Sequence, residues 1–239
     1  MISTLQKLAG FGNEIAHSSS SSVNFNANLP VEIEVLSQLN AFHYRLKIGR
    51  KELSTKSKKE LSVHKKYWAN FDENKGGILT ISQMHLQPEL FEDAFFTPFE
   101  LSSWINRTTF DYTAFRTFLI ETLTQEQCGK ELFQSFSYML HAFSKKIIHL
   151  PLILHGKKVL LQFFHNDPNT LSFYLAFENL GPMHGFLTQN ELLLELCYEK
   201  SLYFLQKEQA KLDMITRFSL QKEIKPLFDR NDVVLDIKG

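Results

Sequence analysis

A period of two in the apolar residues of the C-terminal third constrains the fold of this chain more than any other feature of the sequence. Leu171, Phe173, Leu175 and Phe177 alternate with smaller or polar residues. This alternation predicts a β-strand over residues 171–177 with one buried face. The chain breaks at residues 179–182. A short second strand is predicted over residues 183–187 and, after a polar break, a third strand over residues 192–198.

The flanking sequence completes a domain around these strands. Residues 159–165 read as a strand that pairs back onto residues 171–177 through a turn at residues 166–169. A helical pattern runs from Glu199 to about Phe228, with Pro226 tolerated only at or near the helix end. Residues 233–237 form a predicted closing strand. Residues 149–239 are therefore expected to form an α+β domain of antiparallel strands with one long helix.

Short alternating segments also occur near the N-terminus, at residues 31–35, 42–48, 61–71 and 78–84. The sequence DENKGG at residues 72–77 is a strong hairpin signal between the last two. Several short antiparallel strands in a small domain favour closure, because closure removes exposed strand edges. Residues 30–90 are therefore predicted to form a small β-barrel, closed or nearly closed.

Helical spacing replaces this alternation in residues 91–148. Apolar residues recur with the helical period over residues 99–106, 112–123 and 125–146, which predicts a helical connector. Residues 1–29 contain a five-serine run and too little apolar surface to repay the entropy of ordering. They are predicted to be disordered. The fold class expected for the whole chain is α+β, mostly β.

Charge does not steer the protein toward a particular class of partner. The 26 basic and 26 acidic side chains cancel, so no global field attracts nucleic acid or anionic membrane. A basic run from Arg45 to Lys66 is interleaved with Tyr44, Tyr67 and Trp68. Small barrels with such a surface can stack bases and hold phosphates. The alternative is a solvated rim with the aromatic rings in the core, and nucleic acid is therefore the less favoured partner.

The sequence contains no pattern typical of catalysis, of a bound cofactor or of a metal site. The nearest histidine grouping is His141, His149 and His155, which lacks metal-ligand spacing. Cys128 and Cys197 lie in a predicted helix and a predicted strand and are typical of small buried residues in a reducing compartment. No apolar stretch reaches the length of a membrane span. These features predict a cytoplasmic protein that is not an enzyme, binds no cofactor and does not insert into membranes.

The order of elements in the C-terminal part resembles the C-terminal domain of the flagellar hook-length control protein family. That domain has an apolar strand ending in Leu-Gly, two further strands, a helix and a final strand. Here the matching features are residues 171–179, Leu180 and Gly181, residues 183–187 and 192–198, the helix 199–228 and the strand 233–237. The upstream part is similar to the small β domain of some family members. Met183 and His184 depart from the usual residues after Leu-Gly, and the long Pro/Gln-rich N-terminal half is missing.

The resemblance implies a non-enzymatic regulator of flagellar type III export. Its expected partner is the cytoplasmic domain of the flagellar export switch protein, and other export-apparatus or hook proteins are further candidates. It would control export substrate specificity or hook length from the cytoplasm, associated with the export apparatus or exported through it. The expected contacts are exposed side chains near the Leu-Gly turn, namely Leu180, Gly181, Met183, Phe186 and Leu187. Two alternatives stay open: a small-barrel nucleic-acid-binding module, and a structural or assembly protein of the cell envelope.

Overall fold

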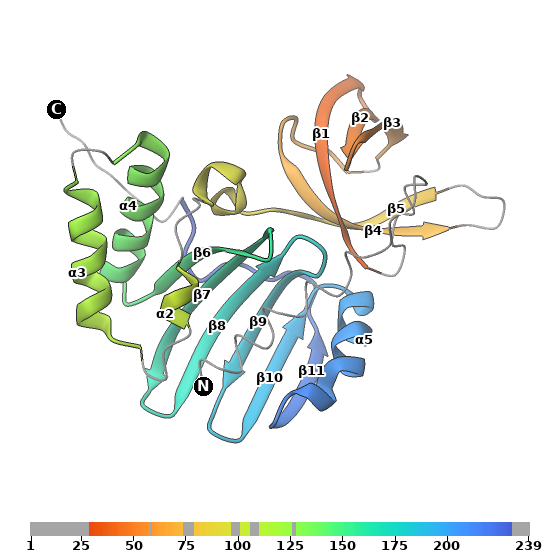
Figure 1. The fold of residues 1–239 in the computed structure, drawn as a ribbon. Coiled ribbons are helices and arrows are strands. Elements are labelled where there is room, and N and C mark those ends of the chain that lie inside the picture. The colour runs from red at the N-terminus through yellow and green to blue at the C-terminus, as the bar shows by residue number, and fades with distance from the viewer. Residues whose placement is uncertain are drawn as a thin grey trace.

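Two β-sheets joined by a helical segment make up the fold, which is α+β and mostly β (Figure 1). The computed structural model describes residues 29–57, 59–73, 79–96, 101–105, 110–125 and 128–230. Disorder is predicted for residues 1–29, of which residues 1–28 lie outside the described residues, whereas Leu29 is described and is buried in the core. The predicted closing strand 233–237 also lies outside the described residues.

The N-terminal sheet has five antiparallel strands in the order β3-β2-β1-β4-β5. The predicted alternating segments lie within or overlap four of them, and β3 is an additional strand. Their bounds are β1 (Val31–Asn40), β2 (His43–Ile48), β3 (Lys51–Lys56), β4 (Lys66–Glu73) and β5 (Leu79–Leu86).

In the part of the chain that the structure describes, this sheet is open and does not close into the barrel predicted for residues 30–90. Among the described residues, β3 and β5 are the outer strands, and no pairing joins them. The strand β1 carries register shifts between Val35 and Ser37 and between Gln38 and Asn40, which bend it. The inner face nevertheless encloses its own core, which includes Ile33, Leu46 and Phe71. The structure is therefore a bent open sheet around a small core.

The helical segment follows as two short 3₁₀ turns and three helices. Their bounds are η2 (Glu89–Phe91), η3 (Asp93–Phe95), α2 (Ser102–Ile105), α3 (Tyr112–Leu123) and α4 (Lys130–Ser144). The helix α3 has the predicted bounds, and the Asp111 side chain caps it by accepting a hydrogen bond from the Ala114 amide at 2.9 Å. Gly129 precedes α4, so this helix begins later than its apolar pattern predicts.

The C-terminal sheet has six strands in the order β11-β10-β9-β8-β7-β6. The pairs from β6 to β10 are antiparallel, whereas β11 runs parallel to β10. The strands are β6 (Ile148–Leu154), β7 (Lys157–Asp167), β8 (Thr170–Phe177), β9 (Gly181–Leu187), β10 (Glu191–Leu196) and β11 (Ile215–Leu220), and α5 (Glu199–Glu208) with η4 (Gln209–Lys211) connects the last two.

The long helix predicted from Glu199 to Phe228 is wrong. The helix α5 ends at Glu208, and Ile215–Leu220 form the edge strand β11. The β-branched residues Ile215 and Thr216 favour a strand, and a full ladder to β10 supplies the backbone hydrogen bonds. Pro226 lies in an irregular segment, residues 221–230, which we call the C-terminal strap.

The two faces of the C-terminal sheet bury different partners. One face packs against α2, α3, α4 and α5 through residues such as Phe115, Phe136, Met139 and Leu205. The other face packs against η2, η3, Trp68 of β4 and Phe228 of the strap. This second cluster joins the N-terminal sheet to the C-terminal sheet. None of the helices that the structure describes has the length and hydropathy needed to span a bilayer.

Candidate functional site

The residues predicted as partner contacts surround the turn between β8 and β9, and most of them are buried. Leu180, Met183 and Leu187 belong to the core beneath the helices, and they are at most 1% exposed. The expected exposure of Met183 is therefore wrong. The strand β9 is paired on both sides, by β8 and β10. Its odd-numbered side chains Met183 and Leu187 face the layer that the helices cover. Phe186 is half-buried, on the opposite face.

Gly181 shapes this turn in a way that another residue would disturb. Its φ of 72° lies in the left-handed region, and a Cβ atom there would approach the Tyr198 ring to 2.6 Å. The Ser201 hydroxyl at the start of α5 donates to the Leu180 carbonyl at 2.8 Å. The Leu-Gly turn is thus packed between α5 and the ring of Tyr198.

Phe186 belongs to a row of side chains that crosses four neighbouring strands. Register pairs Phe164 of β7 with Ser172 of β8, Ser172 with Phe186, and Phe186 with Leu193 of β10. Residues directly opposite on adjacent strands project on the same face. Phe164, Phe186 and Leu193 are each half-buried. They form a partly exposed apolar row on the face opposite the helices.

A network of ion pairs connects the two sheets through the 3₁₀ turns. The Asp93 carboxylate lies 2.8 Å from Lys158 Nζ and 2.9 Å from Lys66 Nζ. Lys66 Nζ also lies 3.1 Å from Glu32 Oε1. Partial burial opposes ionisation of Asp93, but hydrogen bonds from Lys158 and Lys66 outweigh it and lower the pKa of Asp93 to about 2. Beside this network, Lys65 Nζ lies 2.9 Å from Glu89.

A cavity of about 470 Å³ opens between the two sheets. Its walls come from the end of β5, from β8 and β9, and from the C-terminal strap, and they include Trp68, Gln87, Tyr174, Pro182 and Pro226. Pro182 is the residue after Gly181, and a Cβ atom on Gly181 would lie 3.9 Å from the Trp68 ring. The predicted Leu-Gly turn therefore borders this cavity instead of open solvent.

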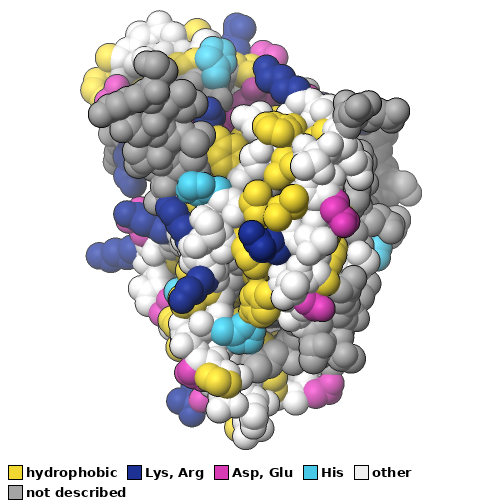
Figure 2. Space-filling view, turned by 90° about the vertical axis from the view of Figure 1, so that its left-hand side faces the viewer, with side chains coloured by type: hydrophobic (Ala, Val, Ile, Leu, Met, Phe, Trp, Pro, Cys, Tyr) yellow, Lys and Arg dark blue, Asp and Glu magenta, His cyan; other side chains and the backbone are white. Residues whose placement is uncertain are grey.

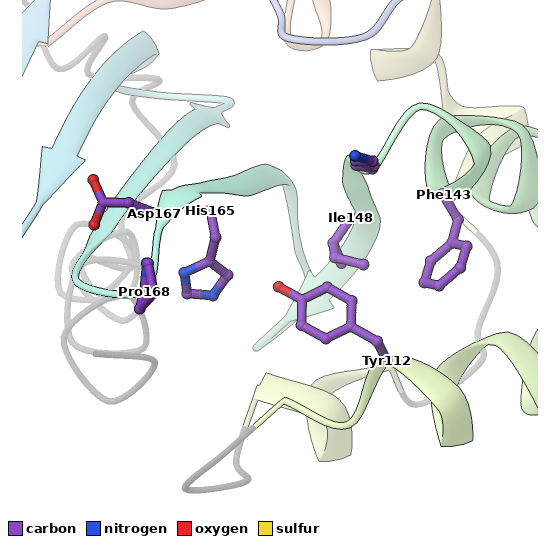
Figure 3. A pocket seen from close by; sticks show the side chains of 7 residues that line it. Tyr112, Phe143, Ile148, His165, Asp167 and Pro168 are labelled. Carbon is purple, nitrogen blue, oxygen red and sulfur yellow. The ribbon is translucent and has the colours of Figure 1, made fainter.

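A second hollow of about 480 Å³ lies where α4 meets β6, and it is mostly apolar. Tyr112 and Ile148 lie next to one another in it, with the Tyr112 hydroxyl directed toward His165 (Figure 3). The Asp167 carboxylate points away from the Tyr112 ring (Figure 3). The Tyr112 and His165 ring centroids are 6.2 Å apart. Burial raises the pKa of Tyr112.

The outer side of α3 and α4 exposes further apolar side chains, among them Ile120 and Phe133. Figure 2 shows apolar side chains gathered on this side of the molecule.

The basic run does not present the aromatic surface that base stacking requires. Tyr44, Tyr67 and Trp68 are all buried, at 7% exposure or less. Lys65 and Lys66 are paired with carboxylates of the 3₁₀ turns and of β1. Arg45 and Lys56 remain on the solvated side of the sheet. This segment therefore matches the alternative to a nucleic-acid surface, in which the aromatic rings lie in the core and the basic side chains lie at the rim.

In the part of the chain that the structure describes, no three His, Cys, Asp or Glu side chains converge as metal ligands. His149 is buried, which lowers its pKa to about 3, and its Nδ1 lies 3.0 Å from Gln162 Nε2. Both His141 and His149 contact the Phe228 ring. Cys197 is buried after β10, and burial raises its pKa to about 11.

Sequence reasoning missed the Asp93 network, the inter-sheet cavity and the strap. No local signal marks the network or the cavity, because their residues are tens of positions apart along the chain, and the strap was missed because residues 221–228 belong to the predicted long helix. Comparisons with protein-family models, with curated proteins and with solved structures find no match to this chain.

Proposed function

We propose that this protein is a non-enzymatic regulator of flagellar type III export that binds the cytoplasmic domain of the export switch protein. The observation that carries the proposal is the order of elements: β8, Leu180 and Gly181, β9, β10, α5 and β11. The helix α5 is shorter than the sequence pattern predicts, and the turn η4 separates it from the strand β11. The strand matched to the family's final strand in the sequence, residues 233–237, lies outside the described residues, and in this proposal β11 takes that place.

The N-terminal sheet supports the same proposal, because it has its own core and matches in position the small β domain of some family members. In this proposal it is a small barrel-like unit. Its strands β3 and β5 would complete a barrel only by approaching each other. The protein would act at the cytoplasmic side of the export apparatus.

The mechanism is recognition without chemistry. The protein would bind one conformation of its partner more tightly than another and shift the partner's population by that difference in affinity. The contact surface proposed is the face of β9 that carries Phe186, together with Phe164 and Leu193 in the same register row. The buried residues Leu180, Met183 and Leu187 would support this surface from the core.

Two substitutions on β9 separate contact from core. Phe186→Asp places a charge on a half-buried face, so we expect the fold to persist and binding to the purified partner domain to be lost. Met183→Asp buries an unpaired charge in the helix-covered core, which costs several kcal/mol, and we expect unfolding. Circular dichroism and thermal melting check the fold, and calorimetric titration with the partner domain checks binding.

Retained binding by a folded Phe186→Asp protein would remove this face from the proposal. Failure of the unmodified protein to bind the partner domain would overturn the function itself. A structural role in the cell envelope would then be the remaining candidate, since the nucleic-acid alternative has lost its aromatic stacking surface.

A further inference from the structure

Three residues lining the inter-sheet cavity carry buried polar atoms without a protein partner. Within the described part of the chain, Trp68 Nε1, Gln87 Oε1 and Tyr174 Oη form no hydrogen bond. Trp68, Gln87 and Tyr174 are 1%, 6% and 0% exposed. Buried polar groups in folded proteins are nearly always paired, and an unpaired one is costly. Three such groups belong to residues that line one cavity, where a bound ligand would pair them.

Neighbouring buried polar side chains show that the fold can satisfy such groups. The Gln162 side chain donates to the Phe228 carbonyl at 2.7 Å and accepts from the Phe228 amide at 3.1 Å. The Ser135 hydroxyl donates to the Phe95 carbonyl at 2.9 Å. Unpaired buried atoms also occur at Asn70 Oδ1, His184 Nε2 and Tyr198 Oη, away from the cavity lining, and what distinguishes Trp68, Gln87 and Tyr174 is that all three line one cavity.

The chemistry of the three atoms defines what the ligand must carry. An indole N–H only donates, so Trp68 requires an acceptor. Gln87 Nε2 donates to Glu32 at 3.2 Å, so its amide is oriented with Oε1 free to accept. The Tyr174 hydroxyl can donate or accept. A ligand that pairs all three carries both a hydrogen-bond acceptor and an N–H or O–H donor.

The surroundings favour an uncharged ligand. Four of the charged side chains at the rim form two pairs, Lys65 with Glu89 at 2.9 Å and Lys225 with Glu223 at 3.6 Å, and the Asp229 carboxylate accepts a hydrogen bond from the Arg230 amide at 2.8 Å. Pro88, Pro182 and Pro226 contribute apolar walls together with Leu86 and Ile224. A charged ligand would meet no unpaired opposite charge among these described groups. Apolar side chains of a ligand would pack against the proline and aliphatic side chains of the walls.

We propose that the inter-sheet cavity binds a short, uncharged peptide segment in extended conformation, whose carbonyl accepts from Trp68 and whose N–H donates to Gln87. A peptide group carries the required acceptor and donor together. The cavity lies at the end of β5, which is an edge strand of its sheet, and strand edges receive extended peptides. Its volume falls within the range of pockets that hold small ligands.

Entry requires a small displacement of the C-terminal strap. The three polar atoms are shielded from solvent, and the strap forms one wall of the cavity. The strap is anchored at its two ends, where the Gln221 amide donates to the Leu196 carbonyl at 2.8 Å and Phe228 is paired with Gln162. Ligand entry would require the middle of the strap, around Pro226, to shift while both anchors hold. The peptide site is independent of the export partner proposed above.

Nuclear magnetic resonance of the full chain tests the site directly, because the chain has two tryptophans, Trp68 and Trp104. A Trp104→Phe variant assigns the indole N–H signal of Trp68. A panel of capped, uncharged tetrapeptides serves as the probe, with N-methylacetamide and inorganic phosphate as comparison ligands. We expect a saturable downfield shift of the Trp68 indole N–H with at least one peptide of the panel. No saturable shift with any peptide, or an equal shift with phosphate, would overturn the proposal.

Tyr174→Phe distinguishes a ligand contact from a structural group. Removing an unpaired buried hydroxyl is expected to leave the melting temperature of the free protein unchanged or raised. The same variant should lower the affinity for the peptide by about threefold to tenfold, the range for one lost hydrogen bond. A lowered melting temperature with unchanged peptide affinity would assign Tyr174 to the fold and contradict its part in the site.

Discussion

At the scale of single residues, close packing decides which side chains the sheet accepts. Gly185 of β9 lies directly opposite Phe173 of β8. A Cβ atom at Gly185 would lie 2.2 Å from Phe173 Cζ, and Phe173 is fully buried, so its ring has little room to retreat. The glycine is therefore required by its neighbour, although its own backbone needs no left-handed conformation.

Gly185→Ala is expected to destabilise the protein by about 1–3 kcal/mol, the usual cost of overpacking a core. Chemical denaturation with urea measures this loss. Gly129→Ser is the matched control, since a Cβ at Gly129 meets nothing within 4 Å and serine is a good helix N-cap. The control should be neutral or slightly stabilising. An equally stable Gly185→Ala protein would show that the Phe173 ring can move.

At the scale of elements, the end of α4 contains a lysine where glycine is the usual residue. Lys146 has a φ of 63°. The Ile147 amide donates to the Ala142 carbonyl at 3.0 Å, and the Lys146 amide donates to the Phe143 carbonyl at 2.9 Å. This pair of bonds is a Schellman motif, in which the residue at the left-handed position pays a steric penalty if it carries a Cβ.

Lys146→Gly is therefore expected to stabilise the protein by about 0.5–1 kcal/mol, after the extra entropy of glycine in the unfolded chain is subtracted. Lys146→Ala keeps the Cβ and removes the charge, so it should give no such gain. Urea denaturation of both variants separates the backbone effect from the side-chain effect. A gain of equal size in Lys146→Ala would contradict the backbone explanation.

At the scale of the whole molecule, the Asp93 network couples the two sheets. It brings Lys66 of β4 and Lys158 of β7 onto one carboxylate. The pKa of Asp93 is lowered from 3.8 to about 2, so in this window the unfolded chain binds more protons than the folded protein. The contribution of Asp93 to stability is fully present above about pH 4 and is lost as the pH falls toward 2.

Because the Asp93 side chain is 70% exposed, solvent screening limits this contribution to about 1 kcal/mol or less. Asp93→Asn should lower the melting temperature at pH 7, and near pH 2 the variant and the unmodified protein should melt at the same temperature. Added salt should narrow the difference between the two melting temperatures at pH 7. Glu223→Gln, which alters an exposed ion pair with Lys225, should change the melting temperature little at either pH. A pH-independent difference would show that Asp93 acts through something other than its charge.

Local patterns in the sequence determined much of the strand and helix framework. The alternation of residues 171–177 predicts β8, and the helical spacing of residues 112–123 predicts α3 with its observed bounds. Both signals are local, because each residue's face follows from its immediate neighbours. The β11 sequence shows the limit of this reasoning. Ile215 and Phe218 also suit a helical stripe, and only pairing with β10 makes them a strand.

Tertiary structure alone decided which of these faces is buried and which residues meet. Met183 and Phe186 are both apolar residues of one short strand, yet the helices cover Met183 and leave Phe186 half-exposed. Trp68 and Tyr174 border the same cavity from different sheets. Contacts across such distances in sequence depend on how complete elements pack. A nearest-neighbour pattern therefore determined the elements, while their packing created the cavity, the ion-pair network and the exposed face.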